Sequence, residues 1–308
     1  MVEKIYPIAI IGSGIAGLTA SIYASRYQIE HLIIGEIPGG IMSESVVVEN
    51  FPGFKSITGL DLAKRLKEQV LSYKPTWEYD SAVKIKEEKN NFVISTKNQK
   101  EFKAHFLILA TGTKRRKLGV SGEKELIGKG VHSCVTCDGY FYKDKNVLIV
   151  GGGDAGVTAA LSITNLAKKV YLLNNLDKLT AMPFWQEKLK TKKNVEIILN
   201  NSVKKFVGKD FLEKVILEKS HNGKNELIVD GVFVEIGADP NTDLAKSLNL
   251  KLDKRDFLQV GCDQKSSHNR VYGAGDASSG SNHFHQMLTA ASEGAIAIDA
   301  IYQEIQKS

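Results

Sequence analysis

The chain has 308 residues, of which 43% are hydrophobic and 25% are charged, and its formal net charge is +6. This composition is typical of a water-soluble protein, and the length allows two domains with substantial hydrophobic cores. The basic residues form no compact block with interleaved aromatic residues, which argues against nucleic-acid binding. The excess positive charge either serves solubility or attracts an acidic protein partner.

The first predicted elements form a strand–helix–strand unit at the start of the chain. The β-branched run "YPIAIIG" is typical of a buried parallel strand, apolar residues at helical spacing follow it, and "HLIIGE" is the next strand. The apolar stretch near residues 5–24 is interrupted by Gly12, Gly14 and Gly17, so we do not interpret it as a membrane span. It also lacks the cleavage site of a signal peptide. We therefore predict a cytoplasmic protein that does not enter a membrane.

The following elements are predicted in chain order. Residues 57–73 have the pattern of an amphipathic helix, and alternation with turn signals over 82–112 predicts a small antiparallel element that returns to a core strand. A second strand–glycine turn–helix–strand unit begins at Asn146, and its turn lies about 140 residues after the first one. The remaining predicted elements are strands and a final helix, over residues 195–208, 211–220, 225–237, 269–280 and 284–305.

The two glycine turns indicate an internal duplication of a nucleotide-binding unit. We predict an α/β fold with two Rossmann-like three-layer domains, the second of which is inserted into a discontinuous first domain. The chain would cross between them near "TGTKRRK" and "EIGADPN". Residues 1–115 and 242–308 would then form the first domain and 116–241 the second, with the two crossings acting as a paired hinge.

The motif Gly12-x-Gly14-x-x-Gly17 follows a strand and opens a helix, which is the context that a dinucleotide site requires. Gly12 permits the tight turn, Gly14 lets a pyrophosphate approach backbone N–H groups, and Gly17 allows the helix to pack closely on the strand. The helix N-terminus favours phosphate. Glu36 ends the next strand, where an acid can accept hydrogen bonds from ribose hydroxyls. The alternative is a glycine-rich turn that serves packing alone.

The chain has three cysteines, which is too few for a disulphide framework, and two of them form one C-x-x-C motif. Cys134 and Cys137 can close a small disulphide, and one thiolate can attack an external disulphide while the other resolves the product. Asp138 follows directly and can shuttle a proton. A zinc site needs four ligands, and only His132 is near as a third. Zinc binding and inert core cysteines are the alternatives to redox chemistry.

Gly275 and Asp276 stand at the mouth of the last predicted helix. This position suits a carboxylate that accepts hydrogen bonds from the ribityl chain of a flavin. The helix N-terminus beyond it can stabilise negative charge on a reduced flavin ring.

Seven short motifs, in order over essentially the whole chain, resemble those of the low-molecular-weight thioredoxin reductases: "GSGIAGLTASIYASR", "VENFPGF", "ATGT", "CVTCDG", "GGGDAG", "IGADPN" and "GAGD". The position of "CVTCDG", just before the second glycine turn, is specific to that group among flavoproteins. The resemblance implies FAD in the first domain, a homodimer, and a thioredoxin-like protein as the substrate.

The same resemblance implies roles for individual residues. Cys137 would face the flavin, Cys134 would attack thioredoxin, and Asp138 would be the acid of the site. The residues that would bind the cofactor are Gly12, Gly14, Ile15, Ala16, Gly17, Glu36, Gly40, Asn50, Gly112, Gly275, Asp276 and Gln286.

The chain departs from the NADPH-dependent members in the second domain. Thr158 and Ala159 stand where the family usually has two glutamates. The usual His-Arg-Arg and following Arg, which hold the 2′-phosphate, are replaced by Asn174, Asn175, Leu176 and Thr180. These differences disfavour NADPH, and the lack of an acid at the strand end disfavours NADH, although Asn174 or Asn175 can bond a ribose.

The ferredoxin-dependent flavin thioredoxin reductases also lack the nicotinamide-binding bases, and the chain resembles them in this respect. Reduced ferredoxin, an acidic protein, is therefore the predicted electron donor. Two alternatives stay open: an NAD(P)H-dependent enzyme with atypical recognition, and a flavin-bound redox sensor without turnover. The chain also has His285-Gln286 where the family commonly has Arg-Gln, and we expect His285 on the surface or in a dimer contact.

Overall fold

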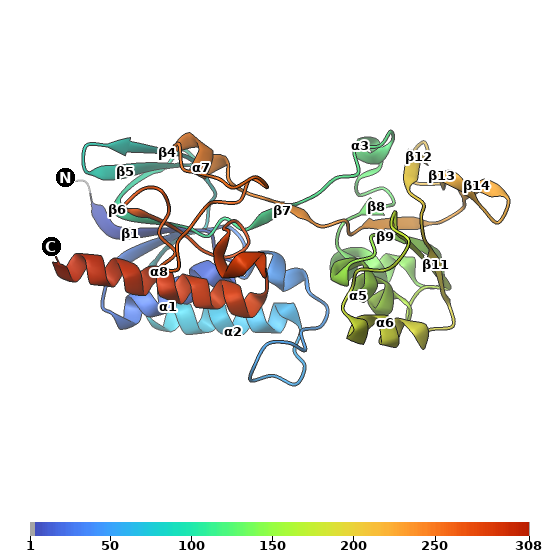
Figure 1. Cartoon of the computed structure of the whole chain (residues 1–308), viewed down its shortest axis with the longest axis horizontal. Coiled ribbons are helices and arrows are strands. Elements are labelled where there is room, and N and C mark those ends of the chain that lie inside the picture. Colours follow the sequence, from blue (N-terminus) through green and yellow to red (C-terminus); the bar gives the residue numbers. More distant parts are fainter. Residues whose placement is uncertain (1–3, 308) are drawn as a thin grey trace. The chain divides into compact units, whose positions relative to one another are not determined.

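The structure is a computed structural model that describes residues 4–307. The chain divides into two compact units (Figure 1). Unit 1 contains the residues up to Lys114 and those from Pro240 onward, and unit 2 contains Arg115–Asp239. Each unit has its own parallel sheet, which confirms the predicted α/β fold. Within residues 4–307, no helix is long and apolar enough to cross a membrane.

The parallel strands of unit 1 form the centre of its sheet. They are β1 (Ile5–Ile11), β2 (His31–Ile34), β3 (Thr76–Glu78), β6 (Glu101–Leu109) and β17 (Val271–Gly273). The sheet order is β3-β2-β1-β6, and β17 pairs with β6. The antiparallel strands β4 (Ala82–Glu88) and β5 (Asn91–Thr96) continue the sheet from β6, as the alternating pattern predicts.

Helices α1 (Ile15–Arg26) and α8 (Met287–Lys307) pack against each other in unit 1 (Figure 1). They can approach closely because Gly294 has no side chain, and a Cβ there would overlap the carbonyl oxygen of Ala16. The predicted amphipathic helix is α2 (Gly59–Ser72), whose N-cap Thr58 accepts a hydrogen bond from the Asp61 amide. The shorter helical elements are η1 (Gly40–Glu44), α7 (Asp243–Ser247) and η3 (Gly280–His283).

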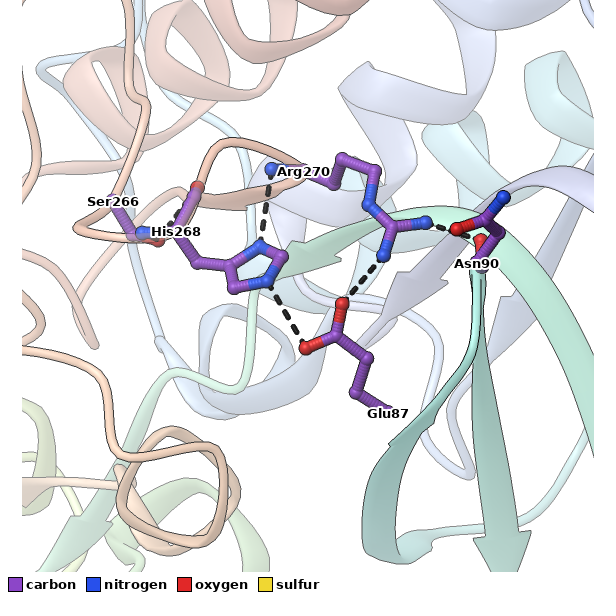
Figure 2. Close-up of polar contacts among 5 residues, drawn as sticks. All are labelled: Glu87, Asn90, Ser266, His268 and Arg270. Carbon is purple, nitrogen blue, oxygen red and sulfur yellow. Dashed lines mark hydrogen bonds and ion pairs between the residues drawn. The ribbon is translucent and has the colours of Figure 1, made fainter.

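A polar cluster holds the β4–β5 hairpin to the segment before β17 (Figure 2). Glu87 of β4 accepts hydrogen bonds from Arg270 and from Nε2 of His268, and Arg270 also donates to the carbonyl oxygen of Asn90. The backbone amide of Arg270 donates to Nδ1 of His268 at 3.2 Å. These contacts fix the start of β17, the strand that leads to Gly275.

Unit 2 has a five-stranded parallel sheet in the order β11-β10-β9-β15-β8. Its strands are β8 (Val131–His132), β9 (Asn146–Val150), β10 (Lys169–Leu173), β11 (Val195–Ile198) and β15 (Gly231–Val234). A separate antiparallel sheet contains β12 (Val203–Val207), β13 (Lys214–His221) and β14 (Lys224–Leu227). Residues 225–237, predicted as strand, therefore contribute to two different sheets.

The helices of unit 2 are α3 (Glu123–Leu126), α4 (Val135–Asp138), η2 (Gly139–Tyr142), α5 (Asp154–Ile163) and α6 (Pro183–Lys190). Helix α5 follows the second glycine turn, as predicted. Where the chain passes between the units, β7 (Thr113–Arg115) pairs with β16 (Ala238–Pro240).

Candidate functional site

The first glycine turn has the geometry of a nucleotide-binding turn. Gly12 has φ +116°, and a Cβ there would overlap the carbonyl oxygen of Ala110. A Cβ at Gly17 would overlap the carbonyl oxygen of Gly12, so this glycine allows α1 to pack on the turn. Gly14, in contrast, has open space where a Cβ would stand. The backbone amides that open α1 are therefore accessible to a ligand, because the first turn of a helix has no internal acceptors for them.

A cavity of about 750 Å³ lies in unit 1 in front of this turn. Its volume falls within the range of cofactor sites, about 300–1,000 Å³. Ten of the residues predicted to bind the cofactor line it: Gly12, Gly14, Ile15, Ala16, Glu36, Gly40, Gly112, Gly275, Asp276 and Gln286. Gly17 does not line the cavity and packs behind it. Asn50 reaches it through Gln286, because its Nδ2 donates to Gln286 Oε1 at 3.0 Å.

Sequence reasoning missed one wall of the cavity. Residues 80–83, just before and at the start of β4, line it. Asp80 is fully buried, and the Thr96 hydroxyl and the amides of Asn98 and Ser81 hold its pKa below the usual range. The sequence before this hairpin indicates a turn, but it does not indicate that the segment lies beside the glycine turn. The two segments are distant in sequence and line one cavity only in the folded chain.

His285, which was expected on the surface or in a dimer contact, is partly buried. Its side chain lines the cavity, and its Nε2 lies 3.3 Å from the carbonyl oxygen of Ser278. It follows the tight turn of η3, where Ser281, Asn282 and His283 all have positive φ angles.

Two acids shape the C-terminal side of the cavity. Asp276 is partly buried at the wall, burial raises its pKa, and its carboxylate has no hydrogen-bond partner among residues 4–307. Glu293 of α8 is buried behind it, burial raises its pKa, and it accepts from the Gly275 amide at 2.7 Å. A partly buried acid without donors fits a ligand that presents hydroxyl groups, as the ribityl chain of FAD does.

The glycine turn of unit 2 repeats the backbone geometry of the first. Gly151 has φ +131°, and a Cβ there would overlap the carbonyl oxygen of Glu235. A Cβ at Gly156 would overlap the carbonyl oxygen of Gly151, just as a Cβ at Gly17 would overlap the carbonyl oxygen of Gly12. The predicted duplication is therefore present in the backbone itself.

The surroundings of the second turn differ from those of the first. The amides of Thr180 and Ala181 donate to the carbonyl oxygen of Gly152, which ties the loop after β10 to the turn. Asn174 is 5% exposed, packs against Gly152, and donates through Nδ2 to the Lys178 carbonyl oxygen at 2.7 Å. The side-chain amide of Asn174 is therefore bonded to the loop. Of the two asparagines predicted to bond a ribose, Asn175 is the exposed one.

Cys134 and Cys137 form the predicted disulphide, with their Cα atoms 5.4 Å apart. Cys134 is 8% exposed and caps α4, where its Sγ accepts from the Cys137 amide at 3.1 Å. Cys137 is exposed. Cys262, the third cysteine, is free and exposed.

Asp138 belongs to a polar network beside the disulphide that the sequence did not reveal. Its Oδ2 lies 3.0 Å from Nδ1 of His132, and Nε2 of His132 lies 2.6 Å from the Tyr142 hydroxyl. His132 was considered only as a third zinc ligand. The C-x-x-C spacing and the proximity of His132 in sequence were the only signals that could have pointed to this network.

Comparison with known proteins places this geometry in context. Residues 6–294 match the family described as pyridine nucleotide-disulphide oxidoreductase. The chain is 36% identical to a thioredoxin reductase from Mycoplasma pneumoniae, over 96% of this chain and 94% of that protein. The crystal structure of T. acidophilum thioredoxin reductase matches with a TM-score of 0.92 at 33% identity, covering 99% and 100% of the two chains.

A further similar structure is a ferredoxin-flavin thioredoxin reductase from Clostridium acetobutylicum. It matches with a TM-score of 0.53 at 28% identity, over 98% of this chain and 99% of that chain. These matches confirm the resemblance drawn from the sequence motifs.

Proposed function

The chain belongs to the pyridine nucleotide-disulphide oxidoreductase family, and we propose that it is a thioredoxin reductase-type enzyme that reduces the disulphide of a thioredoxin-like protein. The observation that carries this proposal is the Cys134–Cys137 disulphide, followed directly by Asp138, in a chain whose other unit has a nucleotide turn and a cofactor-sized cavity. Membership of this family implies FAD as the cofactor.

The cavity residues fit FAD. The amides at the start of α1 would donate to the pyrophosphate, for which Gly14 leaves open space, and Glu36 would accept from the adenosine ribose. Asp276 would accept from the ribityl hydroxyls, and Gln286, held by Asn50, would lie at the ring. Bound FAD would supply the two electrons that return the disulphide to a dithiol.

The two cysteines would then pass these electrons on by thiol exchange. We assign the attack to the Cys134 thiolate, which bonds to one sulphur of the partner's disulphide while the other partner sulphur leaves as a thiolate. The Cys137 thiolate next attacks Cys134 Sγ, re-forms the internal disulphide and releases the second partner sulphur. The partner gains two electrons and two protons, and Asp138 is placed to donate one of these protons.

The order of attack can be tested by trapping. Cys137→Ser leaves the Cys134 thiol without its resolving partner, so it should keep FAD and accumulate a mixed disulphide with a thioredoxin. Cys134→Ser should bind FAD but form no such adduct. Mass spectrometry of the non-reduced mixture distinguishes the two, and an adduct formed only by Cys134→Ser reverses the assignment.

We propose that the electron donor is a reduced ferredoxin rather than NADPH. A charge-assisted hydrogen bond contributes about 1.5–3 kcal/mol, so losing several bases at the 2′-phosphate weakens NADPH binding by orders of magnitude. Between Asn174 and Met182 the only basic residue is Lys178. Residues 115–239 contain 20 basic and 15 acidic residues, so most of the net charge of +6 lies in unit 2, which suits an acidic donor.

The intact glycine turn of unit 2 favours a second candidate, an NAD(P)H-dependent reductase with atypical recognition. The donor experiment separates the two. Purified enzyme is mixed without oxygen with NADPH, NADH or reduced ferredoxin, and the visible absorbance of the flavin is followed in a stopped-flow instrument. We expect rapid bleaching with ferredoxin alone, and rapid bleaching by NADPH would contradict the ferredoxin assignment. Family resemblance also suggests a homodimer, which sedimentation equilibrium would test.

A further inference from the structure

Three side chains from consecutive elements of unit 2 meet beside the redox disulphide. His132 comes from β8, Asp138 ends α4, and Tyr142 ends η2. His132 Nδ1 lies 3.0 Å from Asp138 Oδ2, and Nε2 lies 2.6 Å from the Tyr142 hydroxyl. Both ring nitrogens of the histidine are therefore engaged, one of them by the acid next to Cys137.

The ionised acid decides the direction of the bond at Nδ1. A carboxylate can only accept, so Nδ1 of His132 carries the hydrogen that is donated to Asp138. On the other side of the ring, Nε2 lies within hydrogen-bond distance of the Tyr142 hydroxyl. Burial, reinforced by the charges of Asp138 and Asp230, raises the pKa of Tyr142 to about 12, so this hydroxyl keeps its proton at neutral pH.

The orientation of the imidazole is fixed by packing. Its ring stacks on Phe233 with centroids 5.4 Å apart, and Tyr142 lies edge-on to both rings. Tyr142 fits there because residue 231 is glycine, and a Cβ at Gly231 would overlap the Tyr142 ring. The His132 side chain is 10% exposed, whereas that of Asp138 is 34% exposed. The acid thus has one face on the histidine and one face open to solvent.

We infer that His132 is a positioning residue for the disulphide chemistry, which holds Asp138 and stabilises its carboxylate through the Nδ1–H donor. The inference rests on the proposed thiol exchange. When Asp138 gives its proton to the departing thiolate, a new S–H bond forms and the carboxylate that remains accepts from Nδ1–H. Water reprotonates the acid at its exposed face. No electron passes through His132.

Among the described residues, charged and titratable groups face this network from several elements. Asp138 and Tyr142 bond the imidazole directly, the Lys145 ammonium lies 5.5 Å from the Tyr142 ring centroid, and the charge of Asp230 acts on Tyr142. Removal of the Nδ1–H donor should therefore leave the Asp138 carboxyl without the hydrogen bond that orients it.

Two substitutions separate positioning from packing. His132→Asn retains an N–H donor at the position of Nδ1 and loses the bond to Tyr142, whereas His132→Leu has a similar shape and no donor. His221→Leu is a matched control, because His221 also pairs with a carboxylate of unit 2, Glu196, at 2.6 Å, but does not contact the disulphide site. Flavin content and the melting temperature identify variants that fail to fold.

The measurement is the single-turnover reduction of a thioredoxin disulphide by enzyme that dithionite has already reduced, over a range of pH. We expect His132→Leu to be about tenfold slower than wild type across the pH range, because the Asp138 carboxyl is no longer held beside the disulphide, and His132→Asn to stay within about threefold of wild type. His221→Leu should match wild type.

Equal profiles for wild type and folded His132→Leu would overturn the inference and leave the proposed function intact. Equal losses in the Asn and Leu variants would assign His132 to packing and also overturn it. A wild-type enzyme that reduces no thioredoxin disulphide under these conditions would overturn the proposed function together with the inference.

Discussion

Replacement of Gly14 by alanine tests the cofactor cavity without disturbing the fold. Gly14 precedes α1 with φ −69° and ψ 180°, a conformation that alanine adopts freely. A Cβ there would meet no protein atom within 4 Å, because the space in front of the turn is the cavity. The added methyl group therefore occupies only the volume through which a pyrophosphate would approach the backbone.

The structure sets the size of two separate effects. The stability of the apoprotein should change by less than about 1 kcal/mol, and a small gain is expected because alanine restricts the unfolded chain. Forcing a methyl group into the contact between the turn and the pyrophosphate should cost about 1–3 kcal/mol. That corresponds to an FAD affinity about 5- to 150-fold weaker.

Thermal unfolding of the apoprotein and fluorescence titration with FAD measure these two effects. Gly12→Ala is the contrasting variant, because its φ of +116° and the overlap with Ala110 should destabilise the apoprotein itself. An unchanged FAD affinity in folded Gly14→Ala would refute the assignment of this cavity. A large loss of apoprotein stability would refute the claim that the position is open.

Three further predictions follow from the described contacts. Asn175→Arg combined with Leu176→Arg places two bases on exposed positions at the end of β10, and should strengthen NADPH binding about tenfold or more in isothermal titration if the glycine turn still accepts a pyrophosphate. Burial lowers the pKa of His31, so below the ordinary histidine pKa of about 6.5 the unfolded chain binds a proton that the folded chain does not bind. The free energy of unfolding should therefore fall as pH falls through this range. His31→Gln should reduce this pH dependence in urea unfolding between pH 7.5 and 5.5. Burial raises the pKa of Glu293, so its protonated form favours the fold at low pH and this contribution is lost as pH rises through the raised pKa; Glu293→Gln should therefore gain stability over wild type at pH 8 relative to pH 5, and an unchanged difference would contradict the assignment.

The local features of the site could be predicted from the sequence. The positive φ angles of Gly12 and Gly151, and the close packing of Gly17 and Gly156, follow from a motif six residues long. The disulphide was predictable because Cys134 and Cys137 are three residues apart and can meet within a single turn. Hydrophobic periodicity and turn residues are patterns of a few neighbouring positions, so they were sufficient to predict the strands, the helices and the duplicated unit.

Contacts between segments that are distant in sequence could not be predicted from such local patterns. Asn50 and Gln286 were both assigned to the cofactor site by resemblance, but their mutual hydrogen bond spans 236 positions. Asp80 lines the cavity because the chain enters the β4–β5 hairpin beside the glycine turn. His285 lines the same cavity, just after three successive positive φ angles in η3.

By itself the sequence determined the fold class, the two nucleotide-binding turns and the redox pair, because each depends on residues a few positions apart. Only the tertiary structure decided which side chains complete the sites. In the structure, the Asn174 side chain donates a hydrogen bond to the loop after β10, and His132 lies between Asp138 and Tyr142. Such choices depend on burial and on the exact meeting of side chains from different elements, and those quantities exist only after the sheets and helices have packed.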